Sequence, residues 1–371
     1  MRLWEKFYSS LTKATRPSLL STKRLPASLI ALRPLWTKYY FSGRRNRETN
    51  RIRAGYVAGR QAATGTARDM RGDKKKWMTP MAGAYDDRDG LIWMDGALVP
   101  WRDAKVHVLT HALHYASAVF EGERAYGGVI FKGHEHSKRL LASAAALDIP
   151  SRWTAEEIDE AKDLALKANG LTDGYVRALM WRGSGEDMGV AAALNPVHMS
   201  IAVWEWGAYY GDAKTQGAKL DISKWKRPSP ETIPCHAKAS GLYMICTQAK
   251  HQAQARGCSD ALMMDYRGYV AEATGANIFF TRDGKVHTPT PDCFLNGLTR
   301  QTVIGLLEKN GVEVIERHIM PDELESFEQC WLTGTAAEVT PVGQIGDYNF
   351  EVGAMAVDIA TQYEKLVRGN R

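Results

Sequence analysis

The stretch Ile233-Pro-Cys-His-Ala-Lys-Ala-Ser-Gly-Leu-Tyr243 places Lys238 among small residues, just ahead of a predicted helix. We expect this lysine to lie close to the backbone and to be partly buried. Burial lowers the pKa of a lysine and frees its amine for Schiff-base chemistry. Tyr243 follows at a distance that suits a hydrogen bond to a cofactor hydroxyl. The alternative is that Lys238 is an ordinary solvent-exposed lysine at the start of a helix, because short motifs also occur by chance.

Three further segments carry groups suited to a cofactor with a ring and a phosphate. Tyr269-Val-Ala-Glu-Ala-Thr-Gly-Ala-Asn277 puts Glu272 at a strand end, where a carboxylate can keep a pyridine nitrogen protonated. In Leu295-Asn-Gly-Leu-Thr-Arg300 we expect Thr299 to cap a helix whose free N–H groups bind phosphate. Leu332-Thr-Gly-Thr-Ala-Ala-Glu338 predicts a strand followed by a turn with backbone donors for phosphate or carboxylate. An ordinary turn glutamate and a plain helix cap are the alternatives for the first two.

The order and spacing of these segments resemble the branched-chain aminotransferase family of fold-type IV pyridoxal-phosphate enzymes. The resemblance runs from about Met94 to the C-terminus. It includes three more motifs: Lys105-Val-His-Val-Leu-Thr-His-Ala-Leu-His-Tyr-Ala-Ser-Ala-Val-Phe-Glu-Gly-Glu-Arg124, Glu135-His-Ser-Lys-Arg-Leu140 and Trp204-Glu-Trp-Gly-Ala-Tyr209. It implies a two-domain α+β fold, pyridoxal 5'-phosphate as cofactor, and Lys238 as the Schiff-base lysine. It further implies that Tyr243 contacts the cofactor O3′ and that Glu272 pairs with the pyridine nitrogen. The phosphate ligands that it implies are Arg139, Leu298, Thr299 and Thr335.

The same resemblance implies transamination between branched-chain L-amino acids (leucine, isoleucine, valine) and 2-oxoglutarate, giving branched-chain 2-oxo acids and L-glutamate. The implied apolar pocket consists of Tyr115, Phe120, Val190 and Tyr209. Arg177, with the two tyrosine hydroxyls, would receive the γ-carboxylate of glutamate, and backbone N–H groups of Thr335 and Ala336 would bind the α-carboxylate. Arg124 completes the predicted substrate-binding set. Because Tyr115 and Val190 would reach in from a neighbouring subunit, we expect a homodimer or a higher homo-oligomer.

The chain departs from the family pattern at a few positions. Glu123 stands where the family usually has an apolar residue, which puts substrate choice in doubt, while Leu298 and Thr333 are mild replacements. The segment 272–277 also differs, but no departure affects the lysine. D-amino-acid aminotransferase, (R)-amine transaminase and aminodeoxychorismate lyase are the alternatives on the same fold. A non-catalytic pyridoxal-phosphate-binding protein is the alternative outside enzymes, and it would be expected to lose Lys238 or the Arg177 pocket.

Periodicity and turn signals predict how the body of the chain is divided. We expect a small α+β domain over 81–206, a linker over 207–217 and a larger cofactor-binding domain over 218–371. In the first domain, hairpins are predicted at 91–99 and 126–131, helices at about 134–147 and from the capping box at Thr154 to Gly170, and strands at 175–181 and 198–204. In the second, strands are predicted at 219–223, 261–265, 269–271, 277–281, 285–287, 313–316 and 329–333, and helices at 242–256, 299–310 and 354–368.

The net charge of +6 over 371 residues is unevenly distributed. Residues 1–76 hold 19 lysines and arginines against 4 acidic residues, whereas the remainder holds 29 against 38. A basic tail before an acidic body argues against nucleic acid as a partner of the body, and no apolar run is long enough to span a membrane. We interpret residues 1–80 as a misassigned start, with Met78 or Met81 the natural one; a transit peptide and a disordered basic arm are the alternatives.

The cysteines and histidines indicate neither disulfides nor a metal. The five cysteines are odd in number and irregularly spaced, which predicts free thiols and a reducing compartment. We therefore expect a cytoplasmic protein, or one of an organelle matrix if the tail is a transit peptide. His111-x-x-His114 and His134-x-His136 lack the cysteine or carboxylate partners that would complete a metal site.

Overall fold

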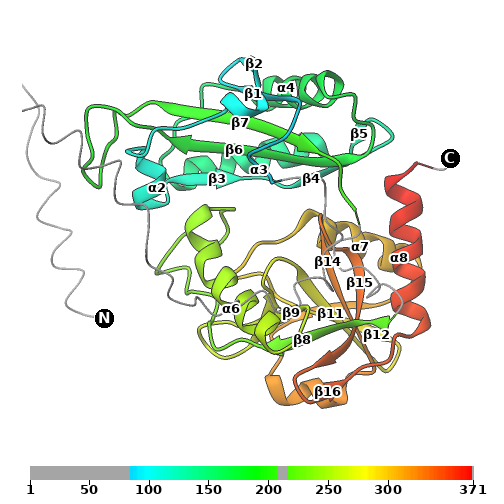
Figure 1. Ribbon diagram of the computed structural model, residues 1–371. Helices are drawn as coiled ribbons and strands as arrows, with labels where there is room; N and C mark the ends of the chain where they lie inside the picture. Colours follow the sequence, from blue (N-terminus) through cyan, green and yellow to red (C-terminus); the bar gives the residue numbers. More distant parts are fainter. Residues whose placement is uncertain (1–83, 208–215, 370–371) are drawn as a thin grey trace, which may run out of the picture. The chain divides into compact units, whose positions relative to one another are not determined.

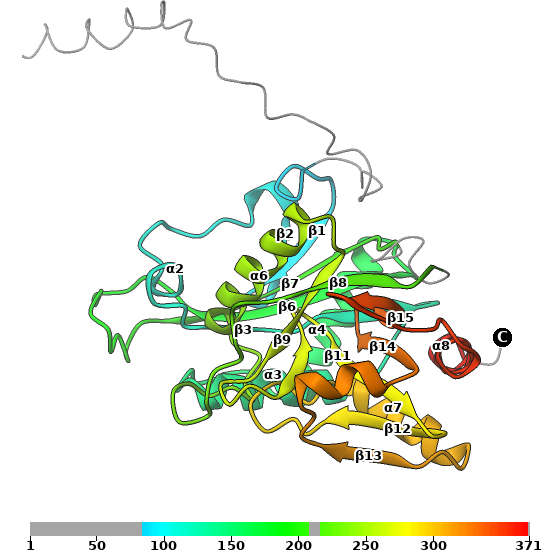
Figure 2. The ribbon, with the colours of Figure 1, turned by 90° about the horizontal axis from the view of Figure 1, so that it is seen from below.

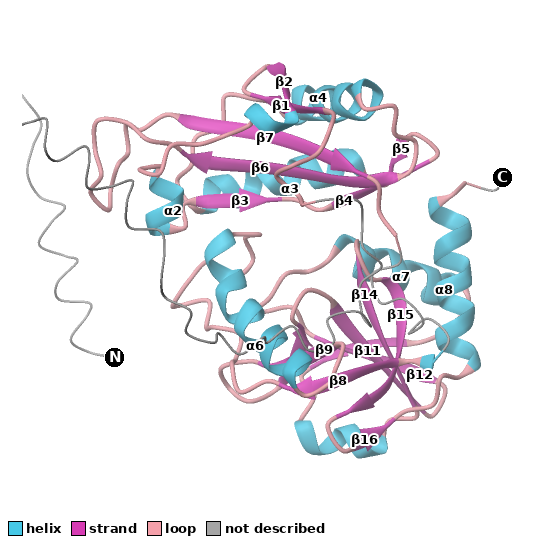
Figure 3. Cartoon of the chain, viewed as in Figure 1, coloured by secondary structure: helices cyan, strands magenta, loops and turns pink. Residues whose placement is uncertain are grey.

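The computed structural model describes residues 84–207 and 216–369, which belong to one compact unit, Arg71–Arg371. The basic tail and most of the predicted linker, including Tyr209, lie outside these ranges. Within them, no helix is long and apolar enough to cross a membrane. The described residues form two separate β-sheets, each covered by helices (Figures 1 and 3).

The first sheet has seven strands within the described ranges, and its pairs are antiparallel. Their spatial order is β2 (Ala97–Pro100), β1 (Leu91–Met94), β7 (Val197–Trp204), β6 (Gly174–Arg182), β4 (Glu123–Tyr126) and β5 (Val129–Ile130), with β3 (Ala118–Phe120) also beside β6. The helices α3 (Gly133–Ala146) and α4 (Ala155–Ala168) pack on each other and on this sheet. A short helix, α2 (His111–Tyr115), precedes β3.

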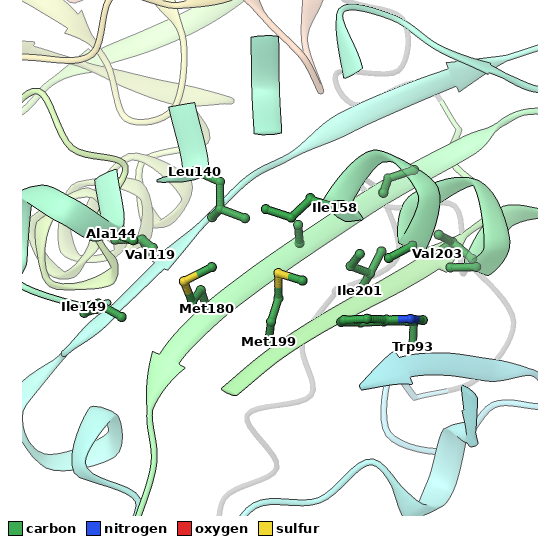
Figure 4. Packing of buried hydrophobic residues seen from close by; sticks show 14 of the residues in the cluster. Trp93, Val119, Leu140, Ala144, Ile149, Ile158, Met180, Met199, Ile201 and Val203 are labelled. Carbon is green, nitrogen blue, oxygen red and sulfur yellow. The ribbon is translucent and has the colours of Figure 1, made fainter. Parts of the chain in front are cut away.

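The first core lies between this sheet and the two helices (Figure 4). Alternate residues of β7 are buried, including Met199, Ile201 and Val203, because successive side chains of a strand point to opposite faces. They meet Leu140 of α3 and Ile158 of α4, which are both fully buried. Each such side chain contributes roughly 1.5–3 kcal/mol through removal of apolar surface from water, so this layer fixes where α3 stands against the sheet.

The second sheet has nine strands within the described ranges (Figure 2 shows several of them from below). Their order is β10 (Val270–Ala273), β9 (Asp260–Met264), β8 (Ala218–Ile222), β15 (Glu338–Ile345), β14 (Gln329–Gly334), β11 (Asn277–Arg282), β12 (Lys285–Pro289) and β13 (Val314–Arg317), with β16 (Tyr348–Asn349) on β15. The helices are α6 (Tyr243–Ala255) against β9, α7 (Leu298–Lys309) against β14, and α8 (Ala354–Val367) against β14 and β15. The 3-10 turns are Trp101–Asp103, Ser240–Leu242 and Pro321–Ser326.

The predicted turns and cap recur in the structure because local backbone chemistry decides them. Asp95 and Gly96 both have positive φ, as a two-residue hairpin requires, and they join β1 to β2. Asp283 and Gly284 do the same between β11 and β12. The Thr154 hydroxyl accepts a hydrogen bond from the Glu157 amide while the Glu157 carboxylate accepts one from the Thr154 amide. The α+β fold class predicted from the sequence is confirmed.

The strand β15, eight residues long and inside the second sheet, was not predicted from the sequence. Its segment includes Pro341, and proline in a run normally argues against a central strand, since it has no N–H for the ladder. The register explains why it is accommodated. Pro341 lies opposite Trp331 of β14, but pairing with β8 begins only at Val342. The proline is therefore hydrogen-bonded into the sheet from one side alone.

A fully buried ion pair connects β4 to α4. Glu123 and Lys162 are both 0% exposed, and Lys162 Nζ donates to Glu123 Oε2 over 2.8 Å. The same ammonium donates to the Gly133 carbonyl over 2.8 Å and lies 3.2 Å from Asp159 Oδ1. Glu123 thus faces the helix layer, and its charge is met by Lys162. This placement explains how the chain accommodates an acidic residue inside the first layer.

Replacing Lys162 by methionine should lower the free energy of unfolding by about 3–5 kcal/mol, because Glu123 would remain buried without its cation. The double variant Glu123→Leu/Lys162→Met should recover most of that loss, since an apolar pair of similar volume removes both desolvation costs. Urea unfolding of the full chain measures both. A double variant as unstable as the single one would contradict the pairing.

Candidate active site

The loop that carries Lys238 is hydrogen-bonded to the first sheet and its helix. The Lys238 amide donates to Ser143 Oγ of α3 over 2.9 Å, and the Lys238 carbonyl accepts from the Phe120 amide of β3 over 3.1 Å. Ala237 and Ala239 on either side are buried in the first core. Small residues are needed here because the loop approaches β3 closely enough for Ala239 to form a β-bridge with Val119.

The Lys238 amine lies among aromatic rings. Its Nζ is 2.8 Å from Tyr243 Oη, a hydrogen bond in which the ammonium donates. It also lies 5.1 Å from the centroid of the Phe120 ring, and the Phe120 and Tyr243 rings are 4.8 Å apart. The structure therefore brings together Lys238 and Tyr243, which were expected to contact the cofactor, and Phe120, which was expected in the apolar pocket.

A cavity opens around this amine, lined by residues of the second sheet and its connecting segments and by Arg139 of α3. Its lining includes all seven residues predicted to bind the cofactor. The full set is Arg139, Arg227, Ala237, Lys238, Leu242, Tyr243, Glu272, Thr274, Gly275, Ala276, Asn277, Leu295, Gly297, Leu298, Thr299, Thr333, Gly334 and Thr335.

Glu272 supplies a buried carboxylate to the cavity. Its Oε2 accepts a hydrogen bond from Asn277 Nδ2 over 3.0 Å, and its Oε1 lies 3.3 Å from Arg227 Nε. Burial raises the pKa of Glu272 to about 7, although the nearby charges of Arg227 and Lys238 act in the opposite direction. A cationic ring nitrogen placed beside this carboxylate would favour its ionised form.

Arg139 and the start of α7 supply hydrogen-bond donors to the same cavity. The Nε and Nη2 atoms of Arg139 donate to Glu121, while its Nη1 is buried without a hydrogen-bond partner among the described residues. Thr333 Oγ1 is likewise buried and unpartnered within those residues. Gly297 lines the cavity as the residue that precedes α7, so the first amide groups of this helix lie at the cavity wall.

The prediction that Thr299 caps α7 is wrong. The helix begins at Leu298 with Gly297 as the capping residue, so Thr299 is the second helical residue. The cause is a close approach: the Gly297 amide donates to Asn277 Oδ1 over 3.2 Å, and a Cβ at Gly297 would collide with that oxygen. The cap therefore lies two residues earlier than predicted, which leaves Leu298 and Thr299 in the first turn, where backbone N–H groups lack helical partners.

Neither of the two arginines predicted to bind substrate lines the cavity. Arg177 stacks its guanidinium 4.8 Å from the Phe120 ring centroid and donates from Nη2 to Tyr175 Oη over 3.1 Å. Its Nε is buried with no hydrogen-bond partner in the described part of the chain. Arg124 is buried, with Nη1 3.8 Å from Glu338 Oε1. The Phe120 ring therefore lies beside both Arg177 and the Lys238 amine, whereas Arg124 is directed to Glu338, the first residue of β15.

Five other predicted substrate residues, Phe120 among them, are absent from the cavity lining or from the described ranges. Tyr115 is 44% exposed and Val190 is 79% exposed, and Tyr115 Oη donates to the Met188 carbonyl over 3.1 Å. Ala336 lies in the turn beside the lining residue Thr335. Tyr209 is outside the described residues. Within one chain, Tyr115 and Val190 are thus surface residues.

The histidines of the two short motifs each have a partner of their own. His134 Nδ1 lies 2.7 Å from Asp159, and His136 Nδ1 lies 2.6 Å from Glu121. His111 Nδ1 lies 2.7 Å from Ser117 Oγ, and His114 Nε2 lies 2.9 Å from the Val108 carbonyl. Neither pair of histidines converges on a common point through these contacts.

The donor set of the cavity fits pyridoxal 5'-phosphate. An amine beside a tyrosine hydroxyl suits the aldehyde and its neighbouring oxygen, and a buried carboxylate suits the pyridine nitrogen. The unpartnered Arg139 Nη1 and Thr333 Oγ1, with the amides at the start of α7, suit a phosphate.

The residues that hydrogen-bond or pair with these cavity groups were not predicted from the sequence. Arg227 and Asn277 hold Glu272, while Glu121 holds Arg139. Asn277 and Glu121 were within quoted motifs, but nothing in their spacing indicated a contact. Arg227 is 45 positions from Glu272, and no local pattern singles it out.

The raised pKa of Glu272 predicts a pH-dependent stability of the cofactor-free chain. The folded chain retains a proton up to about pH 7 that the unfolded chain releases near 4.5, so the free energy of unfolding should fall as pH rises between these values. The contribution is on the order of 3 kcal/mol. Glu272→Gln cannot ionise and should lack this slope. Urea unfolding of both proteins between about pH 5 and about pH 8 measures it, and identical slopes would contradict the assignment.

Comparisons with known proteins agree with this geometry. Residues 118–345 match the family Amino-transferase class IV. The branched-chain-amino-acid aminotransferase of Pseudomonas aeruginosa PAO1 is 42% identical over 264 residues, 70% of this chain and 86% of that protein. That of Escherichia coli K12 is 38% identical over 265 residues, 68% of this chain and 84% of that protein.

Solved structures of branched-chain amino acid aminotransferases are also similar. The enzyme of T.th., complexed with N-(5'-phosphopyridoxyl)-L-glutamate, has a TM-score of 0.73 and 38% identity, and the match covers 76% of this chain and 96% of that one. The enzyme of Thermoproteus uzoniensis, solved with norvaline, has a TM-score of 0.73 and 33% identity, and the match covers 76% of this chain and 96% of that one. With the cavity described above, these matches show that the chain belongs to the class IV aminotransferase family, among the branched-chain-amino-acid aminotransferases.

Proposed function

We propose that this chain uses pyridoxal 5'-phosphate to transfer amino groups between branched-chain L-amino acids and 2-oxoglutarate, giving branched-chain 2-oxo acids and L-glutamate. The observation that carries the proposal is the Lys238 amine, 2.8 Å from Tyr243 Oη, in a cavity with Glu272 and Arg139. The names of the relatives, all branched-chain-amino-acid aminotransferases, support the choice of substrates.

The cofactor would be held through the residues that line the cavity. Arg139, Leu298, Thr299 and Thr335 would hold the phosphate, Glu272 the ring nitrogen and Tyr243 the ring hydroxyl. Pyridoxal phosphate, when bound, supplies an aldehyde carbon for attachment of amines and an electron-poor ring that stabilises charge at the substrate Cα. Ionised Glu272 favours a protonated ring nitrogen, which strengthens that effect.

Lys238 is the residue that we propose to move the proton. As a free amine, its Nζ would take the proton from the substrate Cα and deliver it to the former aldehyde carbon of the cofactor, and it would carry the proton back in the second half-reaction. The hydrogen bond with Tyr243 orients Nζ, and the ring of Phe120 lies beside it. These contacts restrict where the amine can move, so that the same nitrogen serves as base and acid.

The substrate pocket must accept an apolar side chain and the acidic arm of glutamate in turn. Phe120 would contact the apolar chains, and Arg177, which stacks on it, would receive the γ-carboxylate. The buried and unpartnered Nε of Arg177 supports an anionic ligand there. Thr335 and Ala336 would bind the α-carboxylate through backbone N–H groups, and Tyr115, Val190, Arg124 and Tyr209 would complete the pocket.

Separate addition of L-leucine, D-alanine and (R)-1-phenylethylamine to the cofactor-loaded protein tests the proposal. L-leucine alone should convert the visible absorbance band of the cofactor within one half-reaction. Lys238→Ala should abolish both turnover and the lysine-dependent part of that band. Conversion by D-alanine or by the amine instead would overturn the substrate assignment and keep the reaction class, whereas turnover by Lys238→Ala would overturn the role of the lysine.

We further propose that the active form contains at least two copies, with Tyr115 and Val190 entering the neighbouring site. The exposure of large apolar side chains near α2 supports this: Val108 is 72% exposed, Leu113 64% and Leu194 98%. Covering such side chains removes apolar surface from water. The free thiols of all five cysteines support the predicted reducing, cytoplasmic location.

The surface substitution Val190→Asp should shift the protein toward monomers, because it places a charge in the proposed interface. Light scattering coupled to gel filtration measures the mass, and Val129→Asp is the matched control, since Val129 is 66% exposed on β5. We expect turnover with L-leucine to fall only in the Val190 variant. A wild-type protein that is monomeric and active would refute this arrangement.

A further inference from the structure

Two buried carboxylates, Glu121 and Glu123, lie two residues apart and both reach the helix layer of the first sheet. Each is 0% exposed. Glu121 contacts His136 and Arg139 of α3, whereas Glu123 contacts Lys162 of α4. Only Arg139 among these partners lines the cofactor cavity. The two carboxylates therefore form a matched pair, of which Glu121 makes direct hydrogen bonds to a residue that lines the cavity and Glu123 pairs with one that does not.

Glu121 occupies one side of the Arg139 guanidinium. Its Oε1 accepts from Nε over 2.7 Å and its Oε2 from Nη2 over 2.8 Å, a bidentate arrangement that fixes the plane of the guanidinium. The remaining nitrogen, Nη1, is buried without a hydrogen-bond partner among the described residues. The donor left over for a ligand is therefore held in one orientation before the ligand arrives.

His136 holds Glu121 in turn. Its Nδ1 lies 2.6 Å from Glu121 Oε2, and it stands one helical turn before Arg139, so both side chains reach the same carboxylate. Burial alone would raise the pKa of Glu121, but the charges of Arg139 and His136 and their hydrogen bonds outweigh it and hold that pKa well below its usual range. Glu121 therefore stays ionised and keeps its hold on Arg139 throughout the neutral pH range.

We propose that Glu121 is a positioning residue for the phosphate end of the site: it orients Arg139 so that Nη1 meets the cofactor phosphate. This inference rests on the proposed function, because it takes pyridoxal 5'-phosphate as the ligand. Because Arg139 Nη1 is already oriented, less entropy is lost when the phosphate binds. Glu121 should therefore increase the affinity for ligands that carry the phosphate group. Glu123, with its charge met by Lys162, has no such part.

The test compares pyridoxal 5'-phosphate with pyridoxal, which has the same aldehyde and ring but no phosphate. Both are titrated into the cofactor-free full chain, followed by tryptophan fluorescence and cofactor absorbance. In Glu121→Gln we expect affinity for the phosphorylated ligand to fall roughly 10- to 100-fold, the level of hydrogen bonds to charged groups, with little change for pyridoxal. Glu123→Gln is the control: its melting temperature should fall while the ratio of the two affinities stays at the wild-type value.

A double-mutant cycle separates positioning from general damage. In an Arg139→Ala background, Glu121→Gln should leave the affinity ratio unchanged, because the residue through which it acts is gone. Glu121→Asp keeps the charge but has a shorter side chain, so it should also lower the ratio of the affinity for pyridoxal 5'-phosphate to that for pyridoxal. This variant replaces Glu121→Gln in the test if the glutamine variant does not fold.

An unchanged ratio in a folded Glu121 variant, or an equal fall in the Glu123 variant, would overturn the inference alone. A wild-type chain that binds neither ligand would overturn the proposed function and the inference with it.

Discussion

The position of the Lys238 backbone is the constraint on which the site depends. The Lys238 amide donates to Ser143 Oγ of α3 and the Lys238 carbonyl accepts from the Phe120 amide of β3, so both partners belong to the first sheet and its helices. Yet Tyr243, which orients the amine, begins α6 against the second sheet. The reacting amine therefore depends on the packing of both layers, and small residues around it are required because anything larger would keep the loop from β3.

Buried groups of opposite charge make two parts of the cavity wall chemically different. Glu272 presents a carboxylate held by Arg227 and Asn277, whereas Arg139 presents a guanidinium held by Glu121. In surroundings of low dielectric, such groups act strongly on any ligand and require partners when none is bound. A ligand with a basic ring nitrogen and a phosphate satisfies both sets at once. The same logic explains why the supporting residues are themselves charged or polar and buried.

Glu123 shows how a departure from a family pattern can be absorbed without altering the site. The sequence motif placed it beside pocket residues, which suggested an effect on substrate choice. In the fold it faces α4, where Lys162 neutralises it. Its neighbour Glu121 faces α3 and the cofactor end. Two acidic residues in one short segment thus have different relations to the site, because Glu121 faces α3 and Glu123 faces α4.

Local signals along the chain were enough to predict most elements and the chemistry available to the site. Turn residues with positive φ, such as Asp95-Gly96, specified hairpins, and the Thr154 capping box specified a helix start, because these signals act over a few residues. Motif order was enough to name Lys238, Tyr243 and Glu272 as candidates. The five-residue separation of Lys238 and Tyr243 also made their contact foreseeable.

Contacts between distant segments were settled by tertiary packing alone. Arg227 beside Glu272, Glu121 beside Arg139 and the start of α7 at Leu298 all depend on which elements pack together. β15 escaped prediction for the same reason: Pro341 is tolerated because its pairing with β8 begins one residue later, a fact of register between strands. Hydrogen bonds and ion pairs of this kind form across long separations in the chain, so no local pattern of residues encodes them.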